Sequence, residues 1–438
     1  MRAMKDSGIK WIGEIPEEWE VCFVGKALAE VNNPNIDEVE KNTLQFKMGT
    51  IINKKYGNSK YSPESIESYN IVTPGVIMIN GLNLSFDLVS QRVALVKEKG
   101  AITSTYLAMI PKSKQCQSEY TTYLLKAYDD CKALHAMGRG LRATLSYSTF
   151  SKELILLPPL SEQQRIATYL DTKCGEIDEL IGIQERFIEE LKAYKQSVIT
   201  EAVTKGLNPN AKMKDSGVEW IGEIPEGWGL TQIGKIFKFL GGYPYNSDVF
   251  VTESNNQVIR IGNVKNDCLK LAAKPVFIDD KLADQTKNFE INPNTILFTM
   301  TGTKGKRDYF FTLVVPPNKG KEKFFLNQRV GCFIPLNNVN PYYYNFLFKD
   351  SHILDSIFLY ETGTANQGNL GIETIRRTKL QYPPIKEQDQ IAEFLRTKCS
   401  QIDSLITLKQ TKIDELKSFK KSLIYEYVTG KKTVPESV

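Results

Sequence analysis

The chain has 438 residues, 41% hydrophobic and 24% charged, with a net charge of +5. This length and composition predict several folded domains and exclude a globally disordered chain. No apolar run approaches the roughly 18 residues that a membrane span needs, and the N-terminal residues lack the apolar core of a secretory signal. The seven scattered cysteines and two histidines argue against a disulfide framework and a metal site, so we expect a protein of the reducing cytoplasm.

The sequence contains an internal repeat of two copies. Its leading block is MKDSGIKWIGEIPEEWE at 4–20 and MKDSGVEWIGEIPEGWG at 213–229. Its tail begins PPLSEQQRIATYL at 158 and PPIKEQDQIAEFL at 383. The leading blocks are 209 residues apart and the tails 225, so the segments between them differ in length as well as in sequence. Matches at this many fixed positions indicate an internal duplication with constant ends and a variable body.

The two variable bodies, 22–157 and 230–382, have the pattern of α/β domains with short strands. Segments such as 93–96 and 330–334 are short, rich in β-branched or aromatic residues, and bounded by Gly, Pro or Asn. The first body has 16 Lys and Arg against 12 Asp and Glu, and the second has 19 against 13. The rest of the chain is acidic, with 21 against 26. Basic bodies attract phosphate, although a surplus this small is also common in ordinary domains.

The two tails have the apolar periodicity of long helices. After two prolines, Ser161 is a candidate N-cap, and apolar residues then recur at steps of 3, 4 or 7. A helix of about 40 residues is roughly 60 Å long and unstable alone, so we expect the two tails to pair antiparallel about a pseudo-twofold axis. The alternative is that each helix packs only on its own body. The predicted helix-pairing seam consists of Ile177, Leu180, Leu191, Ile402, Leu405 and Leu416.

Polar, glycine-rich loops in both bodies are candidate DNA contacts. The segment 299–307 combines hydroxyls with three cations but lacks the spacing of a nucleotide-binding P-loop. Amide and guanidinium groups can pair with adenine and guanine in the major groove, although each loop taken alone is better interpreted as a plain turn. Two further loops, 137–144 and 361–370, stand at like distances before the tails. The candidate DNA-binding residues are Gln91, Arg92, Arg139, Arg142, Tyr243, Thr303, Lys304, Lys306, Arg307, Gln328, Arg329, Asn366 and Gln367.

The sequence carries no recognised catalytic motif. It has no GxSxG, HExxH or Walker box, and no glycine-rich cofactor loop. We therefore expect no catalytic residues in this chain. The alternatives are an enzyme with an unrecognised centre, and a coiled-coil scaffold or RNA-binding protein that does not read DNA sequence.

The WIGEIPEEW and WIGEIPEGW blocks, the PPLSEQQ and PPIKEQD helix starts and the duplicated layout together resemble the specificity subunit of a type I restriction–modification enzyme. The second body is also similar to that family at NTILFTMTGTKGK and LNQRVGCFIP, whereas the first body lacks the Gly-Thr-Lys-Gly-Lys loop. The resemblance implies that each body reads half of an asymmetric, bipartite double-stranded DNA target. It implies that the coiled coil sets the spacing and docks two methyltransferase subunits. It also implies that those subunits and motor–nuclease subunits bind S-adenosylmethionine, ATP and magnesium.

The predicted fold class is α/β, with two globular target-recognition domains separated by two long helices in an antiparallel coiled coil. The predicted domains are a first target-recognition domain at 1–157, a first conserved helical region at 158–208, a second target-recognition domain at 209–382 and a second conserved helical region at 383–438.

Overall fold

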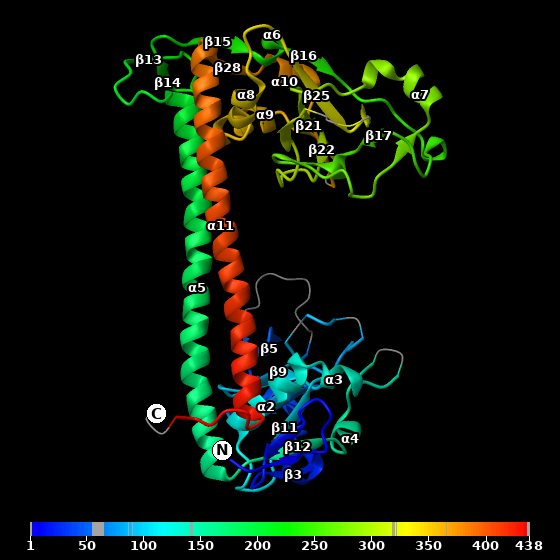
Figure 1. The fold of residues 1–438 in the computed structure, drawn as a ribbon, viewed down its shortest axis with the longest axis vertical. Helices are drawn as coiled ribbons and strands as arrows, with labels where there is room; N and C mark the ends of the chain where they lie inside the picture. The colour runs from blue at the N-terminus through cyan, green and yellow to red at the C-terminus, as the bar shows by residue number, and fades with distance from the viewer. Residues whose placement is uncertain are drawn as a thin grey trace. The chain divides into compact units, whose positions relative to one another are not determined.

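The computed structural model describes residues 2–54, 65–85, 87–89, 91–140, 143–317, 320, 322–364 and 366–435. The chain forms two compact units, one of residues 1–186 with 409–438 and one of residues 187–408. Each unit contains an α/β body and a part of each of two long helices, α5 (Leu160–Lys205) and α11 (Ile385–Val428), which are drawn in Figure 1. Within the described residues, no helix combines the length and apolar character that a membrane span requires.

The body of the first unit is built on a four-stranded antiparallel sheet in the order β4-β11-β8-β9. These strands are β4 (Leu28–Glu30), β11 (Leu107–Pro111), β8 (Ile77–Ile79) and β9 (Val93–Leu95). The described residues of this body also form two-stranded antiparallel pairs. These are β1 (Met4–Asp6) with β2 (Glu14–Pro16), β3 (Glu20–Phe23) with β12 (Leu154–Leu157), β5 (Leu44–Lys47) with β6 (Thr50–Asn53), and β7 (Tyr69–Val72) with β10 (Gly100–Thr103). The short helices are α1 (Val24–Ala27), η1 (Ile36–Glu38), α2 (Ser118–Asp130), α3 (Ala133–Ala136) and α4 (Tyr147–Phe150).

The body of the second unit is built on the same arrangement, with a four-stranded sheet in the order β16-β25-β21-β23. These strands are β16 (Phe237–Leu240), β25 (Val330–Pro335), β21 (Ile296–Thr299) and β23 (Thr312–Val314). Its two-stranded sheets pair β13 (Met213–Asp215) with β14 (Glu223–Pro225), β15 (Gly229–Gln232) with β28 (Lys379–Tyr382), and β18 (Val264–Lys265) with β19 (Cys268–Leu269). In one three-stranded sheet, β17 (Asn256–Ile259) lies between β20 (Phe277–Ile278) and β24 (Lys323–Leu326). In the other, β27 (Gln367–Asn369) lies between β22 (Thr301–Gly302) and β26 (Thr362–Thr364). The helices are α6 (Ile233–Ile236), η2 (Ser247–Val249), η3 (Ile261–Asn263), α7 (Asp280–Gln285), η4 (Lys287–Phe289), α8 (Pro341–Leu347), α9 (Ser351–Phe358) and α10 (Ile372–Arg377).

The two main sheets are therefore equivalent strand by strand, although their sequences differ. β8, buried at every position, occupies the place of β21, which is also buried at every position. The second core is more aromatic: Phe298 stacks on Phe333 with ring centroids 4.2 Å apart. The strand order of the main sheet is the same in both bodies while its buried side chains differ, because cores tolerate apolar exchange when the volume is kept.

Within each unit the parts of α5 and α11 pack side by side in opposite directions. In the first unit, Lys420 Nζ lies 2.6 Å from Asp178, and the hydroxyls of Tyr427 and Tyr169 are 3.2 Å apart. In the second unit, Lys195 Nζ lies 2.7 Å from Asp403. The two ion pairs are equivalent under the 225-residue offset of the tails. The predicted α/β bodies and antiparallel helices are thus confirmed, and the exposed ion pairs fix register more than they add stability.

The buried seam between α5 and α11 contains some of the predicted residues but not all of them. Ile177 and Ile402 are buried, and Leu191 and Leu416 are partly buried. Leu180 and Leu405, however, are each 46% exposed, so their assignment to the seam is wrong. The following residue, Ile181 after Leu180, is buried instead, because one step along a helix turns the side chain by about 100°. Further buried seam residues are Ile188 and Ile413.

We expect replacement of Ile177 and Ile402 with alanine to lower the free energy of unfolding by about 2–5 kcal/mol per site, because each change leaves a cavity. The matched control replaces Leu180 and Leu405 with alanine in the same helices, and it should cost about 0.5 kcal/mol per site or less. Urea unfolding followed by circular dichroism measures both. Equal losses in the two variants would contradict the corrected seam.

Candidate functional site

Two polar loops that the sequence singled out separately form one structure in the second unit. β22, which begins the loop before β23, pairs with β27, and β27 pairs with β26. The Glu361 carboxylate accepts hydrogen bonds from the Gly305 amide at 2.9 Å and from the Tyr309 hydroxyl at 2.7 Å. Lys304 Nζ donates to the Gly363 carbonyl at 3.1 Å. We call this pair, residues 301–309 and 361–369, the second reading surface, after the DNA contact that the sequence predicts for it.

The turn that carries Gln328 and Arg329 adjoins this surface. The amide of Met300, directly before the loop, donates to the Arg329 carbonyl at 3.1 Å. On its other side, the Gln328 amide donates to the Tyr243 carbonyl at 3.1 Å. Gly242 makes this approach feasible, because an added Cβ would stand 2.1 Å from the Asn327 carbonyl oxygen. Backbone bonds therefore link all the predicted segments of the second body.

Most predicted side chains of the second body are exposed. Lys304, Lys306, Gln328, Arg329, Asn366 and Gln367 face solvent, and Thr303 and Tyr243 are half-buried. Arg307 is exposed too, but it forms an ion pair with Asp355 and lies 5.9 Å from the ring centroid of Phe358. Hydrogen bonds from Thr303 hold the pKa of the Asp308 carboxyl below its usual value, so this loop keeps one negative charge among its three cations. Lys306 on this loop and Arg329 on the adjoining turn are both exposed, and neither forms an ion pair with a described residue.

The first unit builds an equivalent pair of loops at the same place in its sheet. The loop after β8 bonds to the glycine-rich loop before α5 through Leu145 amide to Gly81 carbonyl, 2.9 Å, and Leu84 amide to Ala143 carbonyl, 3.1 Å. Arg139 is exposed, and it forms an antiparallel bridge with Thr144. We call the described residues of 81–92 and 137–145 the first reading surface, after the DNA contact that the sequence predicts for them. Arg142, a predicted contact within it, lies outside the described residues.

Arg92 has a structural role that the sequence did not predict. Its side chain is 1% exposed, and it donates to the carbonyls of Asn80, Leu82 and Asp87 at 3.0, 2.8 and 2.7 Å. Because the Arg92 side chain is buried and makes three hydrogen bonds to carbonyls inside the protein, it cannot serve as the predicted DNA contact in this conformation. It instead holds the loop that presents Gln91, which is exposed.

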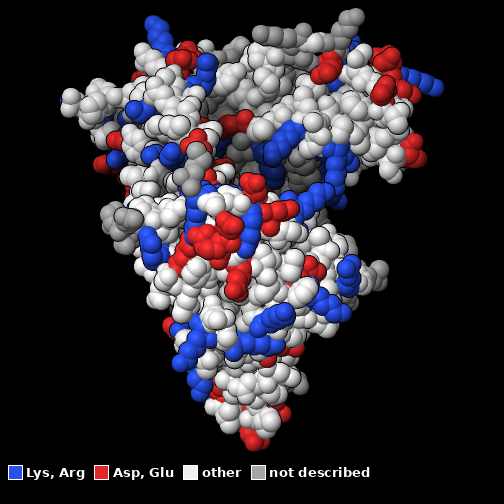
Figure 2. All heavy atoms as spheres, turned by 60° about the horizontal axis from the view of Figure 1, so that its bottom comes forward, with Lys and Arg blue, Asp and Glu red and all other residues white. Residues whose placement is uncertain are grey.

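Other features of the first unit were missed by sequence reasoning. Leu88 and Val89, on the first reading surface, are 56% and 84% exposed. A hollow of about 470 Å³ is lined by Lys26, Lys112 and Lys152 together with Phe23 and Tyr147. These lysines come from three distant parts of the chain, so no spacing in the sequence predicts that they lie together. Over the face drawn in Figure 2, lysine and arginine side chains form small separate groups among acidic and neutral side chains. Positive charge on this face is therefore local and does not form one continuous patch.

The leading blocks, 4–20 and 213–229, bond to the first turns of the two long helices. Trp19 Nε1 donates to Glu162 at 3.0 Å, and Trp228 Nε1 donates to Glu387 at 2.8 Å. The next residue of each helix, Gln163 or Gln388, is fully buried and bonds to backbone groups of its body. α5 begins at Leu160, so Ser161 lies in the first turn and is not the predicted N-cap. The Pro-Pro-x-x-Glu-Gln pattern therefore joins helix to body.

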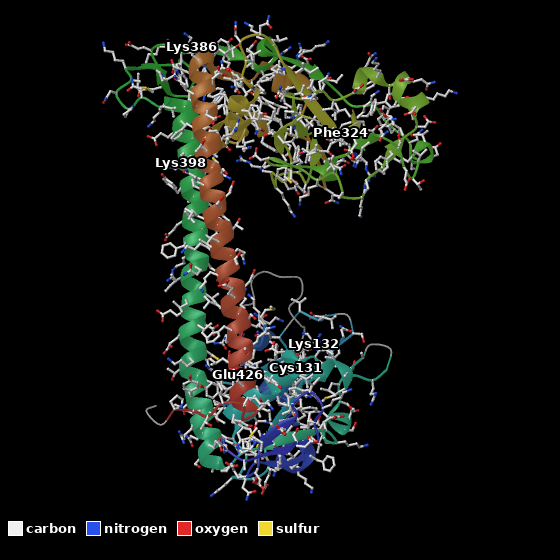
Figure 3. The ribbon with its side chains drawn as sticks, viewed as in Figure 1. Cys131, Lys132, Phe324, Lys386, Lys398 and Glu426 are labelled. Atoms are coloured by element: carbon white, nitrogen blue, oxygen red, sulfur yellow. The ribbon has the colours of Figure 1, made fainter. Side chains whose placement is uncertain are left out.

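The outer surfaces of the two helices are mixed in character. Charged side chains project from α11, among them Lys386 at its start and Glu426 near its end (Figure 3). Between them, Leu408 and Phe419 are 63% and 56% exposed, and Tyr194 on α5 is 49% exposed. In the described part of the chain, no group of three His, Cys, Asp or Glu side chains is arranged to hold a metal ion.

Comparison with known proteins identifies the family. The family model described as "Type I restriction modification DNA specificity domain" matches residues 16–193 and 225–418. The chain belongs to this family. It is a non-catalytic DNA specificity subunit of a type I restriction–modification system, with two target-recognition domains.

Individual relatives agree with this assignment. The chain is 24% identical over 404 residues to the type I restriction enzyme MjaVIII specificity subunit of Methanocaldococcus jannaschii, covering 90% of this chain and 88% of that protein. It is 22% identical over 275 residues to the EcoBI specificity subunit of Escherichia coli, covering 60% and 54%. Among solved structures, a chain from a study of type I R-M complex assembly and conformational transition has a TM-score of 0.69 at 13% identity, covering 94% and 98%. The HsdS subunit from Thermoanaerobacter tengcongensis has a TM-score of 0.50 at 13% identity, covering 95% and 98%. The structural likenesses show the shared fold.

Two arginines of the first reading surface should respond differently to replacement with alanine. Arg92→Ala should lower the free energy of unfolding by about 3 kcal/mol, because a buried side chain is removed and three carbonyls lose their donor. Arg139→Ala should leave it within about 0.5 kcal/mol, because its side chain is exposed. Chemical denaturation of the two variants measures this difference, and an Arg92→Ala protein of unchanged stability would exclude the internal role.

Glu361→Ala should loosen the second reading surface, since the Gly305 amide and the Tyr309 hydroxyl lose their shared acceptor. The expected result is about tenfold faster hydrogen exchange at the Gly305 amide, the equivalent of one hydrogen bond. Glu373→Ala is the control, because Glu373 is exposed and pairs only with Arg376 among the contacts described. Unchanged exchange at Gly305 in Glu361→Ala would show that the bond does not order the loop.

Proposed function

We propose that each target-recognition domain reads one half of an asymmetric, bipartite DNA target through its reading surface. The observation that carries this proposal is the pairing of two polar loops at the same position of both sheets. In both domains these loops are fixed by backbone bonds while most of their polar side chains remain exposed. Fixed, exposed donors are what direct readout of base edges requires.

The chemistry of the two reading surfaces differs, which supports unlike half-sites. The second surface offers Lys304 and Lys306, with Gln328 and Arg329 on the adjoining turn, groups suited to guanine, adenine and phosphate. The first offers Gln91 and Arg139 beside two exposed apolar side chains, Leu88 and Val89, which suit the methyl group of thymine. Arg307, Asn366 and Gln367 also belong to the second reading surface. The lysine-lined hollow of the first unit is a candidate phosphate contact.

The paired helices are proposed to set the spacing between the half-sites and to dock two methyltransferase subunits. Continuous helices of 46 and 44 residues with matched ion pairs resist changes in register. Their exposed apolar side chains suit a protein partner better than DNA, since phosphate contacts need cations. S-adenosylmethionine would be bound by the methyltransferases, and ATP and magnesium by motor–nuclease subunits of the complete assembly in the cytoplasm.

Sequencing of methylated bases tests this function directly. A host that expresses the cognate methyltransferase with this chain should gain methylation at one gapped, non-palindromic motif, and a host without this chain should not. Exchange of residues 22–157 for the corresponding body of another specificity subunit should change one half of the motif and leave the other intact. No gained motif, despite an active methyltransferase and an assembled complex, would favour a scaffold or an RNA-binding protein.

Replacing Lys306 or Arg329 with alanine should weaken binding of the assembled complex to its target. A lost base contact should cost about 1–3 kcal/mol and relax one position of the half-site, whereas a lost phosphate contact should weaken binding to all sequences alike. Fluorescence anisotropy with target and scrambled duplexes at fixed salt distinguishes the two. The control is Arg376→Ala, a cation of the same domain outside the reading surface. If both variants bind like the control, the assigned surface is wrong.

A further inference from the structure

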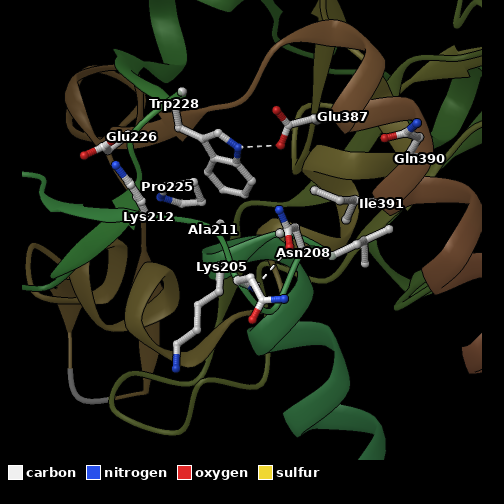
Figure 4. Close-up of a pocket in the computed structure, with 14 residues that line it drawn as sticks. Lys205, Asn208, Ala211, Lys212, Pro225, Glu226, Trp228, Glu387, Gln390 and Ile391 are labelled. Atoms are coloured by element: carbon white, nitrogen blue, oxygen red, sulfur yellow. Dashed lines mark hydrogen bonds between the residues drawn. The ribbon is translucent and has the colours of Figure 1, made fainter.

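A hollow of about 590 Å³ lies in the second unit, where the segment after α5 meets the start of α11 (Figure 4). Its lining includes Asn208, Ala211, Gly227, Trp228 and Glu387. All of these residues belong to the second unit and none belongs to the reading surface. The hollow therefore lies at the junction between the two helices and the leading block, away from the reading surface.

The equivalent place in the first unit is occupied by an arginine of the chain itself. Arg2 donates to both oxygens of the Glu162 carboxylate, at 2.7 and 2.6 Å, and also bonds to Glu18. Its guanidinium carbon lies 5.8 Å from the ring centroid of Trp19. Glu162 raises the pKa of Arg2 further above its ordinary value, so this guanidinium is always charged. Two parallel bonds to one carboxylate, with an aromatic ring nearby, are the geometry for which a guanidinium is suited.

The second copy has the carboxylate and the indole ring, but it has no arginine at the position of Arg2. The 209-residue offset of the leading blocks places Ala211 where the first copy has Arg2, and Gly227 where it has Glu18. Glu387 and Trp228 remain and bond to each other at 2.8 Å through one carboxylate oxygen. Its other oxygen accepts no hydrogen bond from any described residue. A Cβ added at Gly227 would meet no atom within 4 Å, so this side of the hollow is open.

The neighbouring lysines do not replace the missing cation. Lys205 and Lys212 line the hollow, but in Figure 4 both side chains extend away from the Glu387 carboxylate. Both are exposed, and neither forms an ion pair with Glu387 in the described structure. The second copy thus presents a half-buried carboxylate beside an indole ring, with vacant volume in front of it.

We propose that this hollow binds a guanidinium group from outside the chain, paired with Glu387 beside the Trp228 ring. The ligand class is an alkylguanidinium, because the volume accommodates a chain behind the planar group and the acceptor set matches that of Arg2. The group can be carried by a free compound or by an arginine of another polypeptide. The site does not depend on how either reading surface contacts DNA.

The test uses the full chain with its four tryptophans labelled at the indole nitrogen, observed by nuclear magnetic resonance. Agmatine should shift the Trp228 indole signal saturably and leave the Trp19 signal in place, because Arg2 already fills that site. Butylamine, a cation without the planar group, should shift Trp228 much less. Glu387→Gln should weaken agmatine binding by about tenfold, the loss expected for a charged hydrogen-bonded pair.

Exchanging the residues of the two copies makes the test reciprocal. Ala211→Arg should fill the hollow from within and abolish the agmatine-induced shift of Trp228. Arg2→Ala should open the first copy, so that agmatine then shifts Trp19. No shift at Trp228 in the unaltered protein, an equal shift with butylamine, or unchanged binding in Ala211→Arg would each overturn the proposal.

A further pair of titrations identifies the source of the group. Free arginine and the blocked tripeptide acetyl-Gly-Arg-Gly-amide are compared by the same Trp228 signal. A shift with the tripeptide supports an arginine side chain of a partner as the occupant. A shift with free arginine alone supports a small-molecule ligand.

Discussion

The structure depends on polar contacts that fasten each body to the ends of two helices. The last carbonyls of a helix have no partner within it and need one elsewhere. The buried Tyr120 hydroxyl donates to the carbonyl of Val428 in α11, and the equivalent Tyr343 donates to Val203 in α5. Each body therefore holds the start of the helix that follows it and the end of the other helix. The alternative that each helix packs only on its own body is wrong for this reason.

This fastening separates the parts of the chain that are constant from those that vary. The repeated blocks supply Trp19 with Glu162 in one copy and Trp228 with Glu387 in the other, and these contacts do not involve the loops. The loops project from a sheet whose strand order is the same in both bodies. A recognition protein can thus change the residues that face its target while the contacts that hold its frame together stay the same.

The repeat, the two α/β bodies and the antiparallel helices could be predicted because they leave regular patterns in the sequence. The burial and contacts of individual residues were harder to predict. Periodicity located the apolar face of α5 but not whether Leu180 or Ile181 points inward. Composition marked Arg92 as a polar group for DNA, yet its carbonyl partners come from a loop whose path no local pattern encodes. The pairing of 301–309 with 361–369 could not be foreseen, since it joins segments about 60 residues apart through Glu361.

The division of the chain has a consequence for the order of events during translation. The first unit includes residues 409–438, which are synthesised after the whole of the second body. Until α11 emerges from the ribosome, Tyr120 has no Val428 carbonyl to bind, and the surface that receives that helix is bare. The second unit, by contrast, is continuous from 187 to 408. Domains usually mature in the order in which they are made, but here the half that is translated first is the half that is completed last.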